Sequence, residues 1–411
     1  MAPMTAPLCV FARRFSRTAA RIAGYSQPNA LFRRGGSGDP PRNVSIQRCH
    51  AKYFGAIILA LAAAVGADAQ AEPVAGDAAQ AFAAECAAKA APAEKAGQAA
   101  VAGRDGWLFL AAELRHIGVG RFWGDDAPKV SRAARPEDAD PLPAILDFQR
   151  QLAAAGIELI VVPVPPKAVI YPEMLSDRVT ADKDTPPPRL DASLREFLQV
   201  LRAAGVKVID LVPEFLANRF HKDGALYCKT DSHLSGNGCV LAARKIGEEV
   251  RDRPYLAAAP AAEATQEWRT IEIPGDLRQA TADPNAAKER VPLRFVGRRV
   301  EGTLVPLQDD RASPIVVLGD SSNLMFHAGD DMLATGAGLP DQLALQLGVT
   351  VDVAAVRGSG ATAARINLMR RAAADRNYLK GKRLVIWCFT ARDFTEGDGW
   401  RKVPVVKESS P

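Results

Sequence analysis

Runs of apolar, mostly β-branched residues alternate with stretches of helical spacing along most of the chain. Continuous apolar runs of strand length predict buried strands at 157–164, 206–211, 314–318, 349–356 and 383–389. Apolar positions three and four residues apart predict helices at about 142–155, 190–204, 236–252, 339–347 and 361–375. Strands that alternate with helices favour a parallel sheet covered on both faces, so we expect a three-layer α/β fold with right-handed crossovers.

Two segments depart from this alternation. Residues 254–312 are dominated by Pro, Ala and charged residues, with short strand-like pieces at 268–273 and 293–296. We interpret them as an inserted excursion, a small β subregion, within a main domain that covers 101–400. Residues 72–100 are rich in Ala, Glu and Lys and predict a loose N-terminal helix.

The first 71 residues have the character of a leader. Residues 54–66 form a short uncharged apolar run, which follows a basic flank and precedes the small residues of 67–71. This pattern predicts a secretory signal peptide and a periplasmic protein. The run is shorter than the roughly 20 residues that span a bilayer, although a membrane anchor is the alternative. Because some fifty residues precede it, we interpret the N-terminal extension as the product of a start codon placed too early. Val44 is a candidate true start, and a transit segment is the alternative.

Charge is unevenly distributed along the chain. The formal net charge is +5, but the first 71 residues carry nine Lys and Arg against two Asp and Glu, so the remainder is −2. The mature chain is therefore not basic, and its bulk charge gives no reason to expect a nucleic-acid partner.

Four cysteines remain beyond the leader: Cys86, Cys228, Cys239 and Cys388. An even number in an exported chain favours disulfides, with three possible pairings. A bridge between Cys228 and Cys239 would hold the intervening loop against the following helix, and buried free thiols are the alternative. Neither cysteine lies in a C-x-x-C pattern, so we expect no metal site. We expect no cofactor either.

Two tripeptides carry candidate chemistry. Gly319-Asp320-Ser321 follows the predicted strand at 314–318, and Asp231-Ser232-His233 lies in a loop that opens a helix with Ser235 as its predicted N-cap. Ligands of parallel sheets bind at the carboxyl ends of the strands, where Ser321, Gly358 and Gly360 are all expected. A serine, a histidine and an aspartate are the groups that make a hydroxyl nucleophilic at neutral pH.

Few histidines are available as the catalytic base. The mature chain offers four: His116, His221, His233 and His327. Only His233 has an acidic neighbour, Asp231, at a spacing that lets one short loop present both side chains. His327 follows Ser321 by six residues, which on a helix turns the two side chains apart. The alternative for the Asp231 tripeptide is ordinary helix-entry chemistry, because Asp and Ser are common there.

These motifs resemble the SGNH/GDSL superfamily, although the Asp/His pair here precedes the serine. That order is similar to the AlgX/AlgJ-type alginate O-acetyltransferases, a permuted SGNH group. Three further segments resemble the same group: 103–109, 163–173 and 227–238. Leu234 stands where that group usually has an aromatic residue.

The resemblance implies an SGNH-hydrolase-like fold in which Ser321 is the nucleophile, His233 the base and Asp231 the orienting acid. The backbone N–H groups of Ser321, Gly358 and Gly360 would form the oxyanion hole. It implies a periplasmic O-acetyltransferase that acetylates an exported polysaccharide through an acetyl-serine, with a membrane-bound O-acyltransferase as donor partner. A carbohydrate acetylesterase and a non-catalytic glycan-binding subunit are the alternatives.

Several neighbouring residues have expected roles of their own. Ser322 is the rival nucleophile, Asp320 is expected to stabilise the turn, and Asn323 is a guess for the oxyanion asparagine of SGNH enzymes. Arg357 and Arg392, near strand ends, would either bind an acidic sugar or be solvated. The chain ends soon after its last predicted strand, so we expect no C-terminal carbohydrate-binding module, and cellulose or another exopolysaccharide fits as well as alginate.

Overall fold

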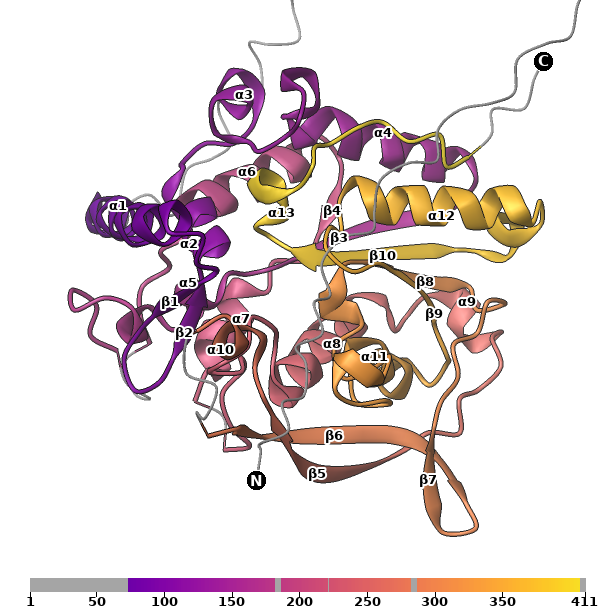
Figure 1. Ribbon diagram of the computed structural model, residues 1–411. Helices are drawn as coiled ribbons and strands as arrows, with labels where there is room; N and C mark the ends of the chain where they lie inside the picture. Colours follow the sequence, from indigo (N-terminus) through magenta and orange to yellow (C-terminus); the bar gives the residue numbers. More distant parts are fainter. Residues whose placement is uncertain (1–72, 182–185, 221, 282–286, 407–411) are drawn as a thin grey trace, which may run out of the picture. The chain divides into compact units, whose positions relative to one another are not determined.

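The computed structural model describes residues 73–181, 186–220, 222–281 and 287–406 (Figure 1). They belong to one compact unit, Asp68–Pro411. The predicted signal peptide and Val44 lie outside the described residues. Within the described ranges, no helix combines the length and the apolarity needed to cross a membrane.

A five-stranded parallel sheet runs through the centre of this unit, in the order β4-β3-β10-β8-β9. Its strands are β3 (Glu158–Val164), β4 (Lys207–Val208), β8 (Ile315–Gly319), β9 (Asp352–Ala355) and β10 (Leu384–Thr390). Each overlaps a predicted strand, but β4 and β9 are shorter than expected. β4 ends early because Asp210 Oδ1 accepts a hydrogen bond from Val212 N–H at 3.1 Å, which turns the chain into the next helix.

Helices cover both faces of the sheet, as Figure 1 shows. One face carries α4 (Pro141–Ala154), α6 (Ala192–Ala203) and α12 (Thr362–Ala374), and the other α5 (Lys167–Ile170), α7 (Val212–Asn218), α8 (Gly236–Val250) and α11 (Leu339–Leu347). Alternate residues of β10 enter different cores, because successive strand side chains point to opposite faces. Val385 and Trp387 pack with α4, α6 and α12, whereas Leu384 and Ile386 pack with the other layer. The predicted three-layer α/β fold is therefore confirmed.

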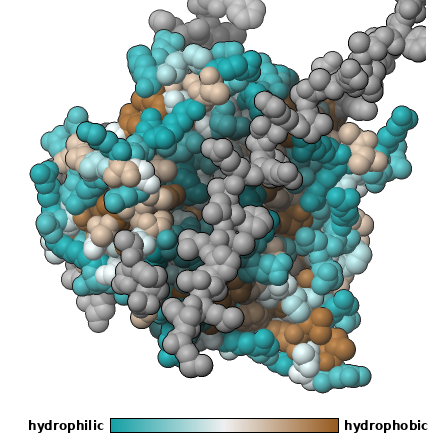
Figure 2. Space-filling view, in the orientation of Figure 1, coloured by the Kyte–Doolittle hydropathy of each residue, from teal (hydrophilic) through white to brown (hydrophobic). Residues whose placement is uncertain are grey.

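The predicted excursion contains a separate antiparallel sheet. Its strands are β5 (Thr265–Ile273), β6 (Glu289–Val300) and β7 (Thr303–Pro306), with the short helix α10 (Asp276–Gln279) between the first two. In Figure 1 the β5–β6 ribbon passes below α8 and α11. The hairpin of β6 and β7 exposes Val300 and Val305. Figure 2 shows hydrophobic residues at the lower right, where Figure 1 draws β7.

The N-terminal part packs on the edge of the domain. Helix α1 (Pro73–Lys95) confirms the helix expected there, and a small hairpin of β1 (Ala100–Ala102) and β2 (Leu108–Leu110) leads into α2 (Ala111–Gly118). The remaining short helices are α3 (Ala127–Val130), α9 (Pro254–Ala257) and α13 (Asp393–Glu396). Single 3-10 turns are η1 (Gly124–Asp126), η2 (Pro136–Asp138), η3 (Pro172–Met174), η4 (Ser321–Asn323), η5 (Asp330–Met332) and η6 (Tyr378–Gly381).

Candidate active site

Strand β8 ends in a tight turn that presents Ser321. A Cβ atom at Gly319 would collide with the Cys388 carbonyl oxygen of β10, so only glycine fits where the strands approach. Asp320 is fully buried and fixes the turn. Its Oδ1 accepts from Ser322 N–H at 3.0 Å, and its Oδ2 accepts from the Thr390 N–H and hydroxyl, each at 2.8 Å. The structural role expected for Asp320 thus agrees with its contacts.

The loop before α8 is held as a narrow bridged turn. Tyr227 and Leu234 form an isolated antiparallel bridge, and Cys228 N–H donates to the His233 carbonyl at 3.2 Å. Ser235 caps α8, since its Oγ accepts from Gly238 N–H at 3.2 Å, as the sequence predicts. Gly238 packs directly on the Leu226 carbonyl, where a Cβ atom would collide. These contacts fix the Asp231-Ser232-His233 segment at the sheet's carboxyl edge.

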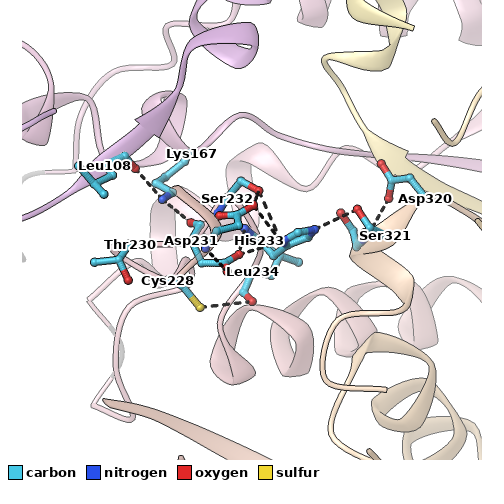
Figure 3. A network of polar contacts seen from close by, with 12 residues as sticks. Leu108, Lys167, Cys228, Thr230, Asp231, Ser232, His233, Leu234, Asp320 and Ser321 are labelled. Carbon is cyan, nitrogen blue, oxygen red and sulfur yellow. Dashed lines mark hydrogen bonds and ion pairs between the residues drawn. The ribbon is translucent and has the colours of Figure 1, made fainter. Parts of the chain in front are cut away.

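The three expected side chains form one hydrogen-bonded chain (Figure 3). His233 Nε2 lies 3.0 Å from Ser321 Oγ, and His233 Nδ1 lies 2.8 Å from Asp231 Oδ1. The other oxygen, Asp231 Oδ2, accepts from Asp276 N–H at 3.0 Å. Ser321 is half-buried, whereas the His233 side chain is 10% exposed and that of Asp231 3%. The geometry suits transfer of a proton from the hydroxyl to the imidazole.

The surrounding charges favour the ionised acid and the charged imidazole. Burial alone would lower the pKa of His233, but the hydrogen bond and charge of Asp231, with the charge of Asp276, outweigh it and raise that pKa above its ordinary 6.5. Arg392 opposes this rise. Burial would raise the pKa of Asp231, yet the His233 ring and the N–H groups of Asp276 and His233 hold it below its ordinary value.

Lys167 supports the loop that carries Asp231. Its side chain is fully buried, and Nζ donates to the carbonyls of Asp231 at 2.6 Å, Leu108 at 2.8 Å and Lys229 at 3.4 Å. Figure 3 shows the Lys167 side chain between Leu108 and Asp231. Burial lowers the pKa of this ammonium, although the nearby Glu113 carboxylate opposes the change. No local pattern indicated that Lys167 contacts the loop, because Lys167 and Asp231 lie 64 positions apart and only folding brings them together.

We expect Lys167→Met to lower the free energy of unfolding by about 3 kcal/mol, because buried carbonyls lose their donor. Urea denaturation followed by circular dichroism measures this change. Lys129→Met is the matched control, since Lys129 is an exposed lysine and its loss should leave the urea midpoint unchanged. Equal midpoints for the two variants would contradict a supporting role for Lys167.

The excursion clamps the same loop from the other side, which the sequence did not indicate. Asp276 Oδ1 accepts from Ser232 N–H at 2.7 Å, and Asp276 Oδ2 accepts from the Ser232 hydroxyl at 2.5 Å. Glu289, at the start of β6, accepts from the N–H groups of Lys229 and Thr230 at 2.7 and 2.8 Å. Pro274-Gly275 is the one local signal of a turn here. The clamp means that the excursion helps to define the site's geometry.

Asp231, His233 and Asp276 also offer ligand atoms within 4.8 Å of one another, a spacing that a cation could use. The same atoms already hydrogen-bond within this cluster, and Asp276 additionally binds Ser232. These bonds account for the arrangement without an ion.

The expected oxyanion donors differ in their surroundings. Among the described residues, no acceptor pairs with the backbone N–H of Ser321. Gly358 is exposed, with φ of 97°. The N–H of Gly360 instead donates to Asp393 Oδ2 at 2.5 Å, so it is already engaged. Asn323 is buried behind the turn, where its Nδ2 donates to the Cys388 carbonyl at 2.8 Å, which is a supporting position.

The disulfide expected between Cys228 and Cys239 is wrong. The cysteines in the described part of the chain are all free, buried thiols: Cys86, Cys228, Cys239 and Cys388. Cys228 Sγ contacts the Leu234 carbonyl, whereas Cys239 lies in the core beneath the sheet. Burial raises the pKa of Cys239 to about 12, so its thiol stays protonated and unreactive. Backbone hydrogen bonds and the Asp276 clamp, not a covalent bridge, hold the loop.

The other candidate residues have partners of their own. His327 is paired with Asp341 at 3.0 Å and Asp309 at 3.2 Å, and His116 contacts Thr395. His221 lies outside the described residues. Two arginines also have acidic partners: Arg357 pairs with Asp331 at 2.5 Å and Arg392 with Glu113 at 3.1 Å. The structure brings the His233 ring to the hydroxyl of Ser321, while Ser322 is buried in the turn.

Known proteins resemble this chain in both sequence and fold. A curated relative, the "probable alginate O-acetylase AlgJ" of Pseudomonas aeruginosa, is 30% identical over 155 residues, which are 38% of this chain and 34% of the relative. The matches span between 34% and 40% of such curated relatives. The solved O-acetyltransferase domain of Pseudomonas putida AlgJ gives a TM-score of 0.52 at 21% identity, covering 72% of this chain and 92% of that one.

Pseudomonas aeruginosa AlgX gives a TM-score of 0.50 at 18% identity, covering 72% of this chain and 63% of that one. At these identities the structural likeness concerns the fold alone. The family model described as "SGNH hydrolase-like domain, acetyltransferase AlgX" matches residues 100–391, most of the chain. The chain therefore belongs to this AlgX family of SGNH hydrolase-like domains.

Proposed function

We propose that this protein is an O-acetyltransferase that acetylates an exported polysaccharide through an acetyl group carried on Ser321. The observation that carries the proposal is the continuous chain of hydrogen bonds from Asp231 through His233 to Ser321 Oγ. Family membership supports an acetyltransferase, and the names of the relatives point to alginate as the first polymer to test. Because the match spans about a third of those relatives, the polymer is part of the proposal.

The first half-reaction transfers the acetyl group from the donor to Ser321. Ser321 Oγ attacks the carbonyl carbon of an acetyl ester while His233 Nε2 takes the hydroxyl proton. The carbon–oxygen bond to the donor then breaks, and His233 returns the proton to the leaving oxygen. Asp231 holds the ring by Nδ1 and stabilises the imidazolium that forms in between. The product is an ester between Ser321 and acetate.

The second half-reaction transfers the acetyl group from Ser321 to a sugar hydroxyl. A polysaccharide hydroxyl attacks the acetyl carbon and gives its proton to His233, and the departing Ser321 Oγ takes that proton back. The backbone N–H of Ser321, which has no acceptor among the described residues, would stabilise the oxyanion in both halves, worth about 3 kcal/mol. The N–H of Gly358 would be the second donor, since that of Gly360 is engaged by Asp393.

Donor and compartment complete the proposal. A signal peptide within the first 71 residues would export the chain to the periplasm. A membrane-bound O-acyltransferase would then supply acetyl groups across the inner membrane, as the family resemblance implies.

Trapping the acyl-enzyme tests the mechanism. The protein is incubated with a soluble activated acetyl ester, and peptide mass spectrometry should find an acetyl adduct on Ser321. Ser321→Ala should carry none. A folded wild-type protein that turns over the ester without any adduct at Ser321 rules the mechanism out. Adding an oligosaccharide acceptor should divert acetyl from water to sugar, which distinguishes a transferase from an esterase.

The acid limb of the rate profile should depend on Asp276. His233 accepts a proton only when its ring is neutral, so activity falls as the pH drops through the pKa of His233, which lies above 6.5. Removing the Asp276 charge lowers this pKa, because Asp276 favours the charged ring. We therefore expect Asp276→Asn to move the acid limb of kcat/KM for a soluble acetyl ester to lower pH.

The matched control is Asp77→Asn, which removes the same charge from an exposed position on α1. Its profile should coincide with that of the wild type. An acid limb that stays in place in Asp276→Asn would show that Asp276 does not influence the titrating group.

A further inference from the structure

A buried carboxylate, Asp393, restrains the loop that carries the proposed second oxyanion donor. Asp393 is the first residue of α13, shortly after β10, and it is 4% exposed. Its Oδ2 accepts from the Gly360 N–H at 2.5 Å. Gly360 and Gly358 belong to the same short loop between β9 and α12. A restraint on Gly360 therefore also limits where the Gly358 N–H can lie.

Gly360 is held from other sides as well. The Trp387 Nε1–H donates to the Gly360 carbonyl at 2.7 Å. A Cβ atom at Gly360 would collide with β10 and lie 3.1 Å from the Asp320 nitrogen, so this backbone packs directly on the turn that precedes Ser321. Figure 3 shows Asp320 on the side of Ser321 away from His233. The loop is thus packed against the turn of the proposed nucleophile.

The position is electrostatically unfavourable for a carboxylate. Burial and the charge of Asp320 raise the pKa of Asp393 from an ordinary 3.8 to about 7. The charge of Arg392 and two backbone N–H groups of the loop oppose this rise without cancelling it, and the Arg392 guanidinium also pairs with Glu113. Because the folded protein binds this proton more tightly than the unfolded chain does, the ionised carboxyl lowers the free energy of unfolding. That loss grows as the pH rises between the two pKa values and is complete above pH 7.

A buried group that lowers stability calls for a purpose other than stability, because proteins keep such groups where function needs them. A carboxylate binds an N–H group more strongly than a neutral oxygen does. Asp393 therefore gives the loop a firmer restraint than an uncharged side chain would, at a cost in stability.

We propose that Asp393 is a positioning residue, whose carboxylate holds the Gly358–Gly360 loop where the Gly358 N–H can meet the developing oxyanion. The inference rests on the proposed function for the oxyanion, whereas the restraint itself exists without any reaction. Oxyanion donors are effective because they are already in place when the charge develops. A loop released at Gly360 must be ordered again in each transition state, so turnover falls while binding of the ester is unchanged.

Hydrogen exchange and ester kinetics at pH 8 test the two parts separately. Asp393→Ala should raise exchange of the peptide that contains Gly360 by about tenfold or more, measured by mass spectrometry. It should lower kcat for a soluble acetyl ester by about 10- to 100-fold, less than the roughly 10²–10³-fold loss when a donor is removed outright, and leave KM unchanged. Asp398→Ala, the loss of a nearby exposed carboxylate, should change neither quantity.

Asp393→Asn separates a positioning role from a structural one. Its amide oxygen can still accept from Gly360 but does so more weakly, so exchange and kcat should lie between those of the wild type and Asp393→Ala. Its Tm at pH 8 should be no lower than that of the wild type, because the unfavourable buried charge is gone. A residue kept for stability would give the opposite pattern, a lower Tm with unchanged kcat.

Wild-type exchange at Gly360 in both variants would overturn the restraint, and raised exchange with wild-type kcat would overturn its role in turnover. If Asp393→Ala fails to fold, wild-type exchange and kcat in Asp393→Asn are enough to overturn the proposal. Absence of an acetyl adduct on Ser321 would disprove the mechanism above, but the exchange result would stand.

Discussion

Replacement of Ser321 by alanine is expected to lower acetyl transfer by about 10⁵-fold or more, because no other group can carry the acetyl. Ser321 Oγ is the atom that the His233 ring reaches, at 3.0 Å, and alanine leaves the imidazole with no hydroxyl to deprotonate. The side chain is small and half-buried, so the fold should survive. Initial rates of acetyl transfer to an oligosaccharide and a thermal unfolding curve measure the two effects separately.

Ser322→Ala is the matched control. Ser322 is the neighbouring hydroxyl, buried within the turn, with its N–H on Asp320 Oδ1. This variant should keep transfer within a few-fold of the wild type. The reverse pattern, with Ser322→Ala inactive and Ser321→Ala active, would move the nucleophile by one residue and invalidate the proposed proton path.

Replacement of Asp231 by asparagine should cost about 10⁴-fold in kcat, the second-largest effect. An asparagine has nearly the same shape, but its amide can donate to Nδ1 and so favour the tautomer that carries the proton on Nε2. In that tautomer the ring cannot accept the proton of Ser321 Oγ. The lost carboxylate also no longer stabilises the imidazolium. Measuring kcat for a soluble acetyl ester across pH reveals both effects.

Asp309→Asn is the control for this change, since it makes the same replacement beside another histidine, His327, outside the hydrogen-bonded chain. Its kcat should match that of the wild type. An Asp231→Asn enzyme within tenfold of wild-type kcat would mean that the aspartate does not orient the base.

Much of the sheet could be predicted from the sequence because its strands are buried on both faces. Such strands, like β3 and β10, read as continuous apolar runs whatever lies around them. The N-cap at Ser235 could also be predicted, because a cap is a hydrogen bond between residues three positions apart in the sequence. The strand predicted at 206–211 was too long, because the edge position of β4 and its end before Asp210 depend on the helix that follows.

The candidate site could be predicted in part. Residue types and the strand–turn context suggested Ser321, His233 and Asp231, and the fold brings the three into contact. The supports of the loop could not be predicted, because Lys167 and Asp276 lie 64 and 45 positions from Asp231. The engaged N–H of Gly360 was missed for the same reason. The choice between a disulfide and free thiols at Cys228 and Cys239 stayed open until the fold decided it.

The sequence by itself determined the alternation of elements, the buried strands and the chemical groups available at the strand ends, because hydrophobic period and capping are local properties. Only the tertiary structure decided which groups meet. Contacts such as that of the excursion with the Asp231 loop, or of Arg294 with Gln342, join distant segments whose approach depends on packing of the whole domain. Because packing depends on all elements of the domain together, these contacts cannot be predicted from any single stretch of the sequence.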